Sequence, residues 1–238
     1  MTSEPTIETL LGWVERGQRQ FEDAVAALPA AAATEASALP GWTRGHVITH
    51  VARNADALVN LLTWADTGTP TPMYATPTQR DDDIEAGAGR ALAEQLDDLR
   101  ESGRRFAATA AALSTNAWQT TVRNAQGVEM PASKIPWFRT REVWLHLVDL
   151  GAGPGVDVIP DDVAAELVRD VATWMSPKLD QAASLRPEGH LPVPLGPDID
   201  TPTTIAGPAN RIAGWLVGRA DASRLRCEGS VPDLPRWL

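Results

Sequence analysis

Hydrophobic side chains recur at helical spacing in four segments of the first 150 residues. In the first segment, Leu10, Val14, Phe21 and Val25 fall on one face of a helix, as expected for an amphipathic helix that packs on a core. The four segments predicted to be helices are residues 6–27, 43–64, 83–113 and 136–150. Four amphipathic helices in succession predict a helix bundle.

The pattern changes after a segment rich in Gly and Pro at residues 151–160, which predicts a boundary between two domains. The elements expected beyond this boundary are helices over residues 161–185 and 208–218 and short strands near residues 191–195, 201–206 and 223–229. The predicted fold class is therefore α+β. It combines an N-terminal four-helix bundle, residues 1–155, with a small mixed α/β domain, residues 156–238.

The composition of the 238-residue chain, with 43% hydrophobic residues, fits a globular protein with a sizeable core. Cys227 is the one cysteine, so no intramolecular disulfide can form, and a cytoplasmic location is expected. We expect Cys227 to be a small buried strand residue rather than a nucleophile. The net charge of −10 argues against a nucleic-acid partner. No membrane-spanning segment and no heptad repeat is evident, so a monomer without a membrane partner is expected.

The predicted helix at residues 136–150 is hydrophobic around nearly its whole circumference, yet it carries Glu142 and His146. Because these two residues are four positions apart, they lie one turn apart on the same face of the helix. A buried carboxylate needs a partner, since an unpaired buried charge is costly. The pair is equally consistent with a structural ion pair and with part of a metal site.

The predicted helix at residues 43–64, with Thr43 as its N-cap, carries His46 and His50. On a helical wheel His50 borders the apolar face, whereas His46 lies about 40° further toward the polar face. Taken alone, His50 would suit a hydrogen-bonded core histidine. Together with Glu142 and His146, it would supply two imidazoles and one carboxylate to the interior of the bundle.

Two histidines and one glutamate leave an open position on a tetrahedral zinc ion, which is typical of catalytic rather than structural sites. The same ligands would suit non-haem iron. Asp149, which follows His146 by about one turn, is either a hydrogen-bond partner of that ligand or a helix-terminal residue without a chemical role. Arg139 and Arg141 are either carboxylate-binding groups or surface charges.

Four segments of the chain carry a recognisable pattern, namely LPGWTRGHVITHVARNADALVNLLTWADTGTPTPMY, AQGVEMPASKIPWFRTREVWLHLVDLGAG, IAGPANRIAGWLVGRA and EGSVPDLPRWL. They resemble the mycothiol-dependent maleylpyruvate isomerases, a DinB-like family. The resemblance implies a DinB-like four-helix bundle that binds zinc and a small α/β domain that closes over the site. The zinc ligands of the family match His50, Glu142 and His146, and its essential arginine matches Arg219.

The resemblance also implies a reaction, the mycothiol-dependent cis–trans isomerisation of maleylpyruvate to fumarylpyruvate in gentisate breakdown. Zinc lowers the pKa of a bound thiol, so a thiolate would add to the double bond, allow rotation and leave again. Arg219 would bind a carboxylate or the developing enolate, although its position alone suggests only a favourable charge at a helix end. Two alternatives stay open: a mycothiol S-transferase, which would consume the thiol, and a non-catalytic zinc-binding module.

Overall fold

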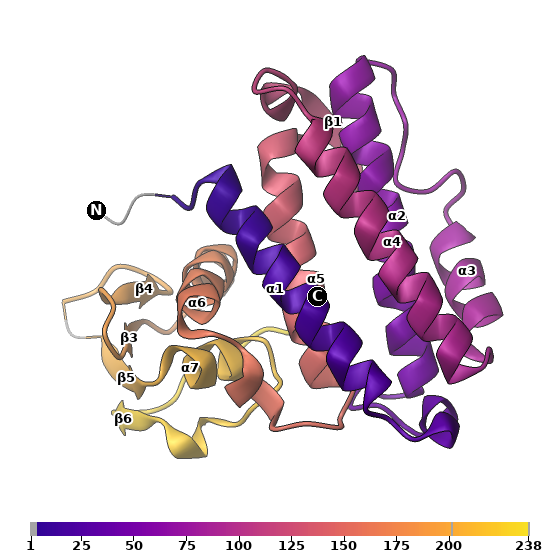
Figure 1. The fold of residues 1–238 in the computed structure, drawn as a ribbon. Helices are drawn as coiled ribbons and strands as arrows, with labels where there is room; N and C mark the ends of the chain where they lie inside the picture. The colour runs from indigo at the N-terminus through magenta and orange to yellow at the C-terminus, as the bar shows by residue number, and fades with distance from the viewer. Residues whose placement is uncertain (1–3, 201, 238) are drawn as a thin grey trace. The chain divides into compact units, whose positions relative to one another are not determined.

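The computed structural model describes residues 4–200 and 202–237 and divides into two compact units, Met1–Gly153 and Pro154–Leu238. The first unit is mainly helical, and the second combines two helices with a four-stranded sheet (Figure 1). The predicted α+β fold class is therefore confirmed. Within the described ranges, no helix has the length and apolar character needed to cross a membrane.

The first unit contains four long helices, one short helix and a two-stranded hairpin. These elements are α1 (Ile7–Ala26), α2 (Arg44–Thr67), α3 (Gln79–Ala88), α4 (Leu92–Ala112), β1 (Thr121–Arg123), β2 (Glu129–Pro131) and α5 (Ile135–Asp149). The four long helices α1, α2, α4 and α5 form the predicted bundle. The hairpin of β1 and β2 was not predicted, because strands of three residues are too short to show an alternating pattern.

The continuous helix predicted over residues 83–113 is wrong, because the chain leaves the helical conformation between α3 and α4 (Figure 1). Gly89 ends α3, and Ala91 has an extended backbone with φ −58° and ψ 143°. The amide of Ala91 donates to the Glu94 carboxylate, as at the start of a new helix. The Gln95 side chain donates to two carbonyl oxygens at the end of α3, at 2.9 and 3.0 Å. The apolar spacing continues across this break and therefore conceals it.

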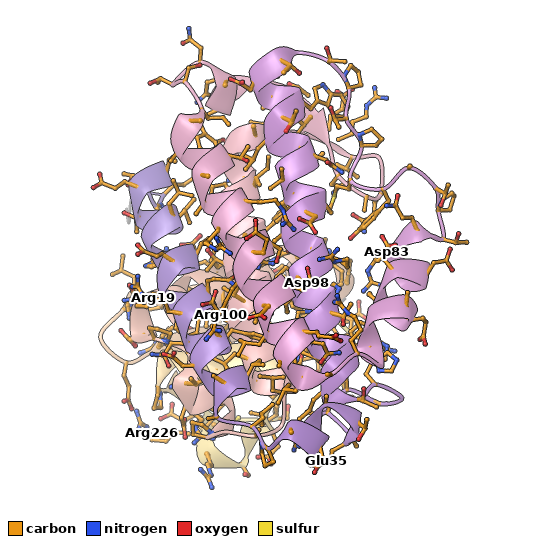
Figure 2. All side chains as sticks on the ribbon, turned by 45° about the vertical axis from the view of Figure 1, so that its right-hand side comes forward. Arg19, Glu35, Asp83, Asp98, Arg100 and Arg226 are labelled. Carbon is orange, nitrogen blue, oxygen red and sulfur yellow. The ribbon has the colours of Figure 1, made fainter. Side chains whose placement is uncertain are left out.

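The helix α2 is central to the first unit, since it packs against α3, α4 and α5. The fully buried side chains shared by α2, α4 and α5 include Leu58, Leu61, Leu62, Phe106 and Ile135. Ion pairs add a second contact between α2 and α4. Asp98, which Figure 2 labels on α4, pairs with Arg53 on α2 and also with Arg90. The core and these ion pairs together fix the orientation of α2, which carries His50.

The helices α1 and α5 approach closely at Gly17. A Cβ atom at this position would lie 2.5 Å from Cγ2 of Val143 and 2.8 Å from Nε1 of Trp144. The indole N–H of Trp144 donates to the carbonyl oxygen of Trp13 at 3.2 Å. The missing side chain at Gly17 therefore allows α1 to pack directly on the helix that carries two of the predicted ligands.

The second unit consists of α6 (Asp161–Met175), β3 (Ala183–Pro187), β4 (Val193–Leu195), β5 (Thr203–Gly207), α7 (Ala209–Leu216) and β6 (Arg226–Glu228). Its strands form one sheet in the order β4-β3-β5-β6, in which β3 and β5 are parallel and the other neighbours are antiparallel. The helix predicted over residues 161–185 is wrong beyond Met175. Pro177 lacks an amide hydrogen and ends the helix, and residues 183–187 form β3 instead.

We predict that Gly17→Ala destabilises the protein by about 1–3 kcal/mol, the usual range for overpacking, because the new methyl group must displace Val143 or Trp144. The measurement is urea unfolding followed by far-UV circular dichroism. The matched control is Gly12→Ala on the same helix, where a Cβ atom meets nothing within 4 Å. That control should stabilise α1 by about 0.5–1 kcal/mol. Equal stability of the two variants would contradict the close approach of α1 and α5.

Candidate metal centre

His50, Glu142 and His146 meet in the interior of the first unit. His50 comes from α2, and the other two residues come from α5. Nε2 of His50 lies 2.8 Å from Oε2 of Glu142, and Nε2 of His146 lies 3.2 Å from the same oxygen. One donor atom from each residue lies within 4.8 Å of the other two. The structure therefore brings together the three residues that the helical spacing and the resemblance selected.

His46 has a different role from His50, although both belong to α2. The backbone N–H of Thr43 donates to Nδ1 of His46 at 3.2 Å, and Oγ1 of Thr43 accepts from the backbone N–H of His46. These reciprocal bonds form a capping box at the start of α2. The ring of His46 therefore stabilises the beginning of α2, and the next turn of the helix places His50 beside Glu142.

Asp149 holds the ring of His146. Its Oδ2 lies 2.9 Å from Nδ1 of His146, and the side chain of Asp149 is 1% exposed. Its backbone oxygen accepts a hydrogen bond from the N–H of Ala38 at 2.9 Å, which ties this end of α5 to the loop before α2. A carboxylate on the second ring nitrogen is the usual partner of a histidine metal ligand, and it directs Nε2 toward Glu142.

The three residues of the cluster shift one another's pKa values. Burial would raise the pKa of Glu142, but hydrogen bonds with His146 and His50 outweigh it and hold the pKa well below the usual range. Burial would lower the pKa of His146, but Asp149 and Glu142 raise it to about 9. Burial lowers the pKa of His50. Glu142 is thus ionised and His50 neutral near pH 7, which are the forms that bind a metal ion.

The donor set fits a zinc ion in its chemistry, and its spacing is slightly short. Donor atoms on a tetrahedral zinc ion lie about 3.3–3.6 Å apart when the bonds are about 2.0–2.2 Å long. The separation of His146 and Glu142, 3.2 Å, is near this range, whereas that of His50 and Glu142, 2.8 Å, is a hydrogen-bond distance. The side chains of Glu142 and His146 remain 25% and 15% exposed. This side of the cluster is therefore accessible, as a centre that binds a ligand requires.

Side chains from the segment before α2, from the loop before α3 and from the first turn of α3 lie near the cluster. The ring of Trp42 lies 5.6 Å from that of His50, edge to face, and the guanidinium of Arg80 lies 5.9 Å from the centre of Trp42. Burial raises the pKa of Tyr74 to about 12, and the charges of Arg80 and Glu142 also act on it. Tyr74 therefore keeps its hydroxyl proton near neutral pH and can donate it in a hydrogen bond.

Arg139 and Arg141 differ in their surroundings. Arg139 is fully buried, so its interpretation as a surface charge is wrong, and its guanidinium is bound by oxygens from α1 and α2. Arg141 is half-buried and lies 4.9 Å from the centre of the Phe138 ring. The contacts of Arg139 could not be predicted from the sequence, because its partners come from other helices.

The remaining candidates lie in the second unit. Arg219 is in the turn after α7, where its Nη1 donates to the carbonyl oxygen of Val217 at 2.8 Å and its backbone N–H donates to Gly214 at 2.8 Å. Cys227 is on β6 opposite Ile205 and is half-buried, with its Sγ 3.3 Å from the carbonyl oxygen of Gly229. Cys227 therefore lies on a strand as expected, but it is partly exposed, so the expectation that it is buried is wrong.

Comparison with known proteins agrees with this architecture. The family described as mycothiol maleylpyruvate isomerase N-terminal domain matches residues 14–151, more than half of the chain. A crystal structure of the mycothiol-dependent maleylpyruvate isomerase is similar over 100% of both chains, with 33% identity and a TM-score of 0.88. A mutant of that enzyme, with alanine in place of a histidine, matches equally well. No curated protein sequence matches. The chain therefore belongs to the mycothiol-dependent maleylpyruvate isomerase family.

Proposed function

We propose that this protein is a zinc- and mycothiol-dependent isomerase that converts maleylpyruvate to fumarylpyruvate in the gentisate pathway of aromatic catabolism. The observation that carries the proposal is the convergence of His50, Glu142 and His146 on one accessible point, in a member of this enzyme family. The cytoplasmic location and the monomeric state stay predictions from the sequence.

His50, Glu142 and His146 would hold the metal ion through two imidazole nitrogens and one carboxylate oxygen. Bound zinc would supply a lowered thiol pKa, so that mycothiol is available as a thiolate near neutral pH. Asp149 fixes the tautomer and orientation of the His146 ring through Nδ1. The protein therefore contributes a prearranged set of donors with one side left for the thiol.

The surrounding side chains suit an anionic substrate. Tyr74 can donate a hydrogen bond, and Arg80 provides a positive charge beside Trp42. We assign to Arg219 of the second unit the binding of a substrate carboxylate, because a planar guanidinium can form two parallel hydrogen bonds with it. In this proposal the second unit closes the site, as the resemblance implies.

The first prediction from the proposed function concerns enzymatic activity. Purified zinc-loaded protein should isomerise maleylpyruvate only when mycothiol is added, and His50→Ala should lose at least about 100-fold in activity, since even partners of metal ligands typically account for 10- to 100-fold. A spectrophotometric assay measures the turnover. The matched control is His190→Ala, which removes a histidine from a His–Asp pair in the second unit, 2.6 Å apart, and should keep full activity.

The same assay separates the alternatives. An isomerase regenerates free thiol in every turnover, whereas an S-transferase consumes one thiol for each product. Stoichiometric loss of free mycothiol would therefore replace the isomerase with the S-transferase. Tight zinc binding without any effect of the thiol would favour a non-catalytic zinc-binding module.

A second prediction concerns Arg219. Arg219→Ala should lower kcat/KM by about 100-fold or more while zinc content is unchanged, because removing one partner of a hydrogen-bonded charge pair typically costs about 2–5 kcal/mol. Arg219→Lys should recover only part of this loss, because a lysine cannot form the paired hydrogen bonds. Steady-state kinetics and metal analysis provide the two readouts. Arg224→Ala, at an exposed position in the same unit, is the control, and unaltered kinetics in Arg219→Ala would remove this residue from the mechanism.

A third prediction concerns the pH dependence of zinc binding. His146 has a raised pKa of about 9, so at lower pH zinc must displace its proton. The apparent affinity should rise about tenfold per pH unit between pH 6 and 8.5, since one proton is released for each ion bound. Chelator competition and calorimetry in buffers of different ionisation enthalpy measure the slope and the proton release. A flat profile over this range would contradict the proposed protonation of His146.

A further inference from the structure

Arg139 is a buried cation that connects three helices of the first unit. It belongs to α5 and is 0% exposed. Its Nη1 donates to the carbonyl oxygen of Val51 at 2.7 Å and to Oδ1 of Asn54 at 2.9 Å, both on α2. Its Nη2 donates to Oε1 of Gln18 on α1 at 2.8 Å. One guanidinium thus joins α5 to α2 and α1.

The partners of this guanidinium are unusual for a buried charge. All three acceptors are neutral oxygens, and Nε of Arg139 has no hydrogen-bond partner. Burial lowers the pKa of Arg139 to about 10, and Glu142 is the carboxylate that opposes this most strongly. The side chain is still charged at neutral pH. A buried charge without a hydrogen-bonded carboxylate is destabilising, so an apolar residue would serve general packing better.

The residues that Arg139 contacts on α2 lie next to a proposed metal ligand, as does Arg139 itself on α5. Val51 directly follows His50, and Asn54 is one turn further along α2. Arg139 precedes Glu142 by three residues and therefore lies on the adjacent turn of α5. The guanidinium therefore binds the part of α2 that presents His50, while its own backbone belongs to the part of α5 that presents Glu142.

We propose that Arg139 is a positioning residue of the metal centre, which sets the distance between His50 on α2 and the ligand pair on α5 through its bonds to Val51 and Asn54. The role assigned to the metal ion rests on the proposed function. Arg139 does not touch the substrate in this proposal. It acts through the geometry of the donors, and its removal should alter how a metal ion is held even when no thiol or substrate is present.

Three variants test the proposal. Arg139→Met removes the guanidinium at similar length, and Arg139→Lys keeps the charge but not the planar fork of donors. Asn54→Ala leaves Arg139 in place and removes one acceptor on α2, so it disturbs the core less. The matched control is Phe106→Leu, which disturbs the buried core of the bundle at α4 and removes no polar group.

The readouts are zinc affinity from chelator competition and the visible absorption of the Co²⁺-substituted protein, both without mycothiol or substrate. Ligand geometry determines the Co²⁺ bands, so a merely structural loss of stability does not shift them in the folded fraction. We expect Arg139→Met and Arg139→Lys to weaken zinc binding about 10- to 100-fold, the range for residues that orient ligands, and to change the Co²⁺ spectrum. Asn54→Ala should show a smaller change in the same direction.

The outcomes are distinguishable. Failure of the wild-type protein to bind zinc would contradict the proposed function itself. If the wild type binds zinc and Arg139→Lys or Asn54→Ala binds it equally well with an unchanged Co²⁺ spectrum, Arg139 is not a positioning residue. The same loss in Phe106→Leu as in the Arg139 variants would also overturn the proposal, since it would show that any disturbance of the core weakens the site. If Arg139→Met does not fold, zinc affinity and the Co²⁺ spectrum of Arg139→Lys and Asn54→Ala test the proposal.

Discussion

The burial of one carboxylate, Glu142, on a helix that is apolar on nearly all sides is the constraint on which the centre depends. An ionised carboxylate in such a place is stable only when protein groups replace the hydrogen bonds that it would form with water. The structure supplies His50 from α2 and His146 from the next turn of α5. Each partner then needs its own support, and Asp149 binds the far side of His146. A single buried charge therefore requires a chain of polar contacts that would be costly without a function.

The bundle around these polar contacts holds α2 and α5 at a fixed separation. The helix α5 is covered by α1 at the close approach of Gly17, and α2 is fixed by its large apolar interface with α4. The hydrogen bonds at the start of α2 and at the end of α5 limit sliding along the helix axes. Rigid helices suit a metal centre, because ligands on helices hold their spacing better than ligands on loops.

Much of the fold and the identity of the three converging residues followed from the sequence, because helical periodicity is a local property. The order of residues alone shows that Glu142 and His146 are one turn apart and that His50 is at the edge of an apolar stripe. The break between α3 and α4 was missed because the apolar spacing continues through Gly89. The strand β3 was missed because apolar residues at positions 175, 179, 182 and 183 keep a helical spacing past Pro177. These errors arise where helix ends depend on capping and tertiary contacts rather than on pattern.

The contacts of Arg139 could not be predicted for a different reason. An arginine in a helix is solvent-exposed far more often than it is buried, and its three acceptors are far away along the chain. The three acceptors are one backbone oxygen and two amide side chains, which carry no charge that would suggest a pair. Only the assembled bundle shows that the guanidinium lies against the turn after His50. Residues that orient ligands are therefore harder to find in a sequence than the ligands themselves.

Under the proposed function, the charges around the centre would let a chain with a net charge of −10 hold an anionic ligand. Glu142 and Asp149 are negative and Arg139 is positive, so a divalent cation that replaces the proton of His146 leaves one net positive charge in this buried group. In surroundings of low dielectric constant, this charge acts strongly on a thiolate or a carboxylate at short range. At longer range the acidic surface repels anions, and salt screens the interactions of exposed charges more than those of buried ones. Binding at such a centre should therefore select ligands by fit at close contact rather than by long-range attraction.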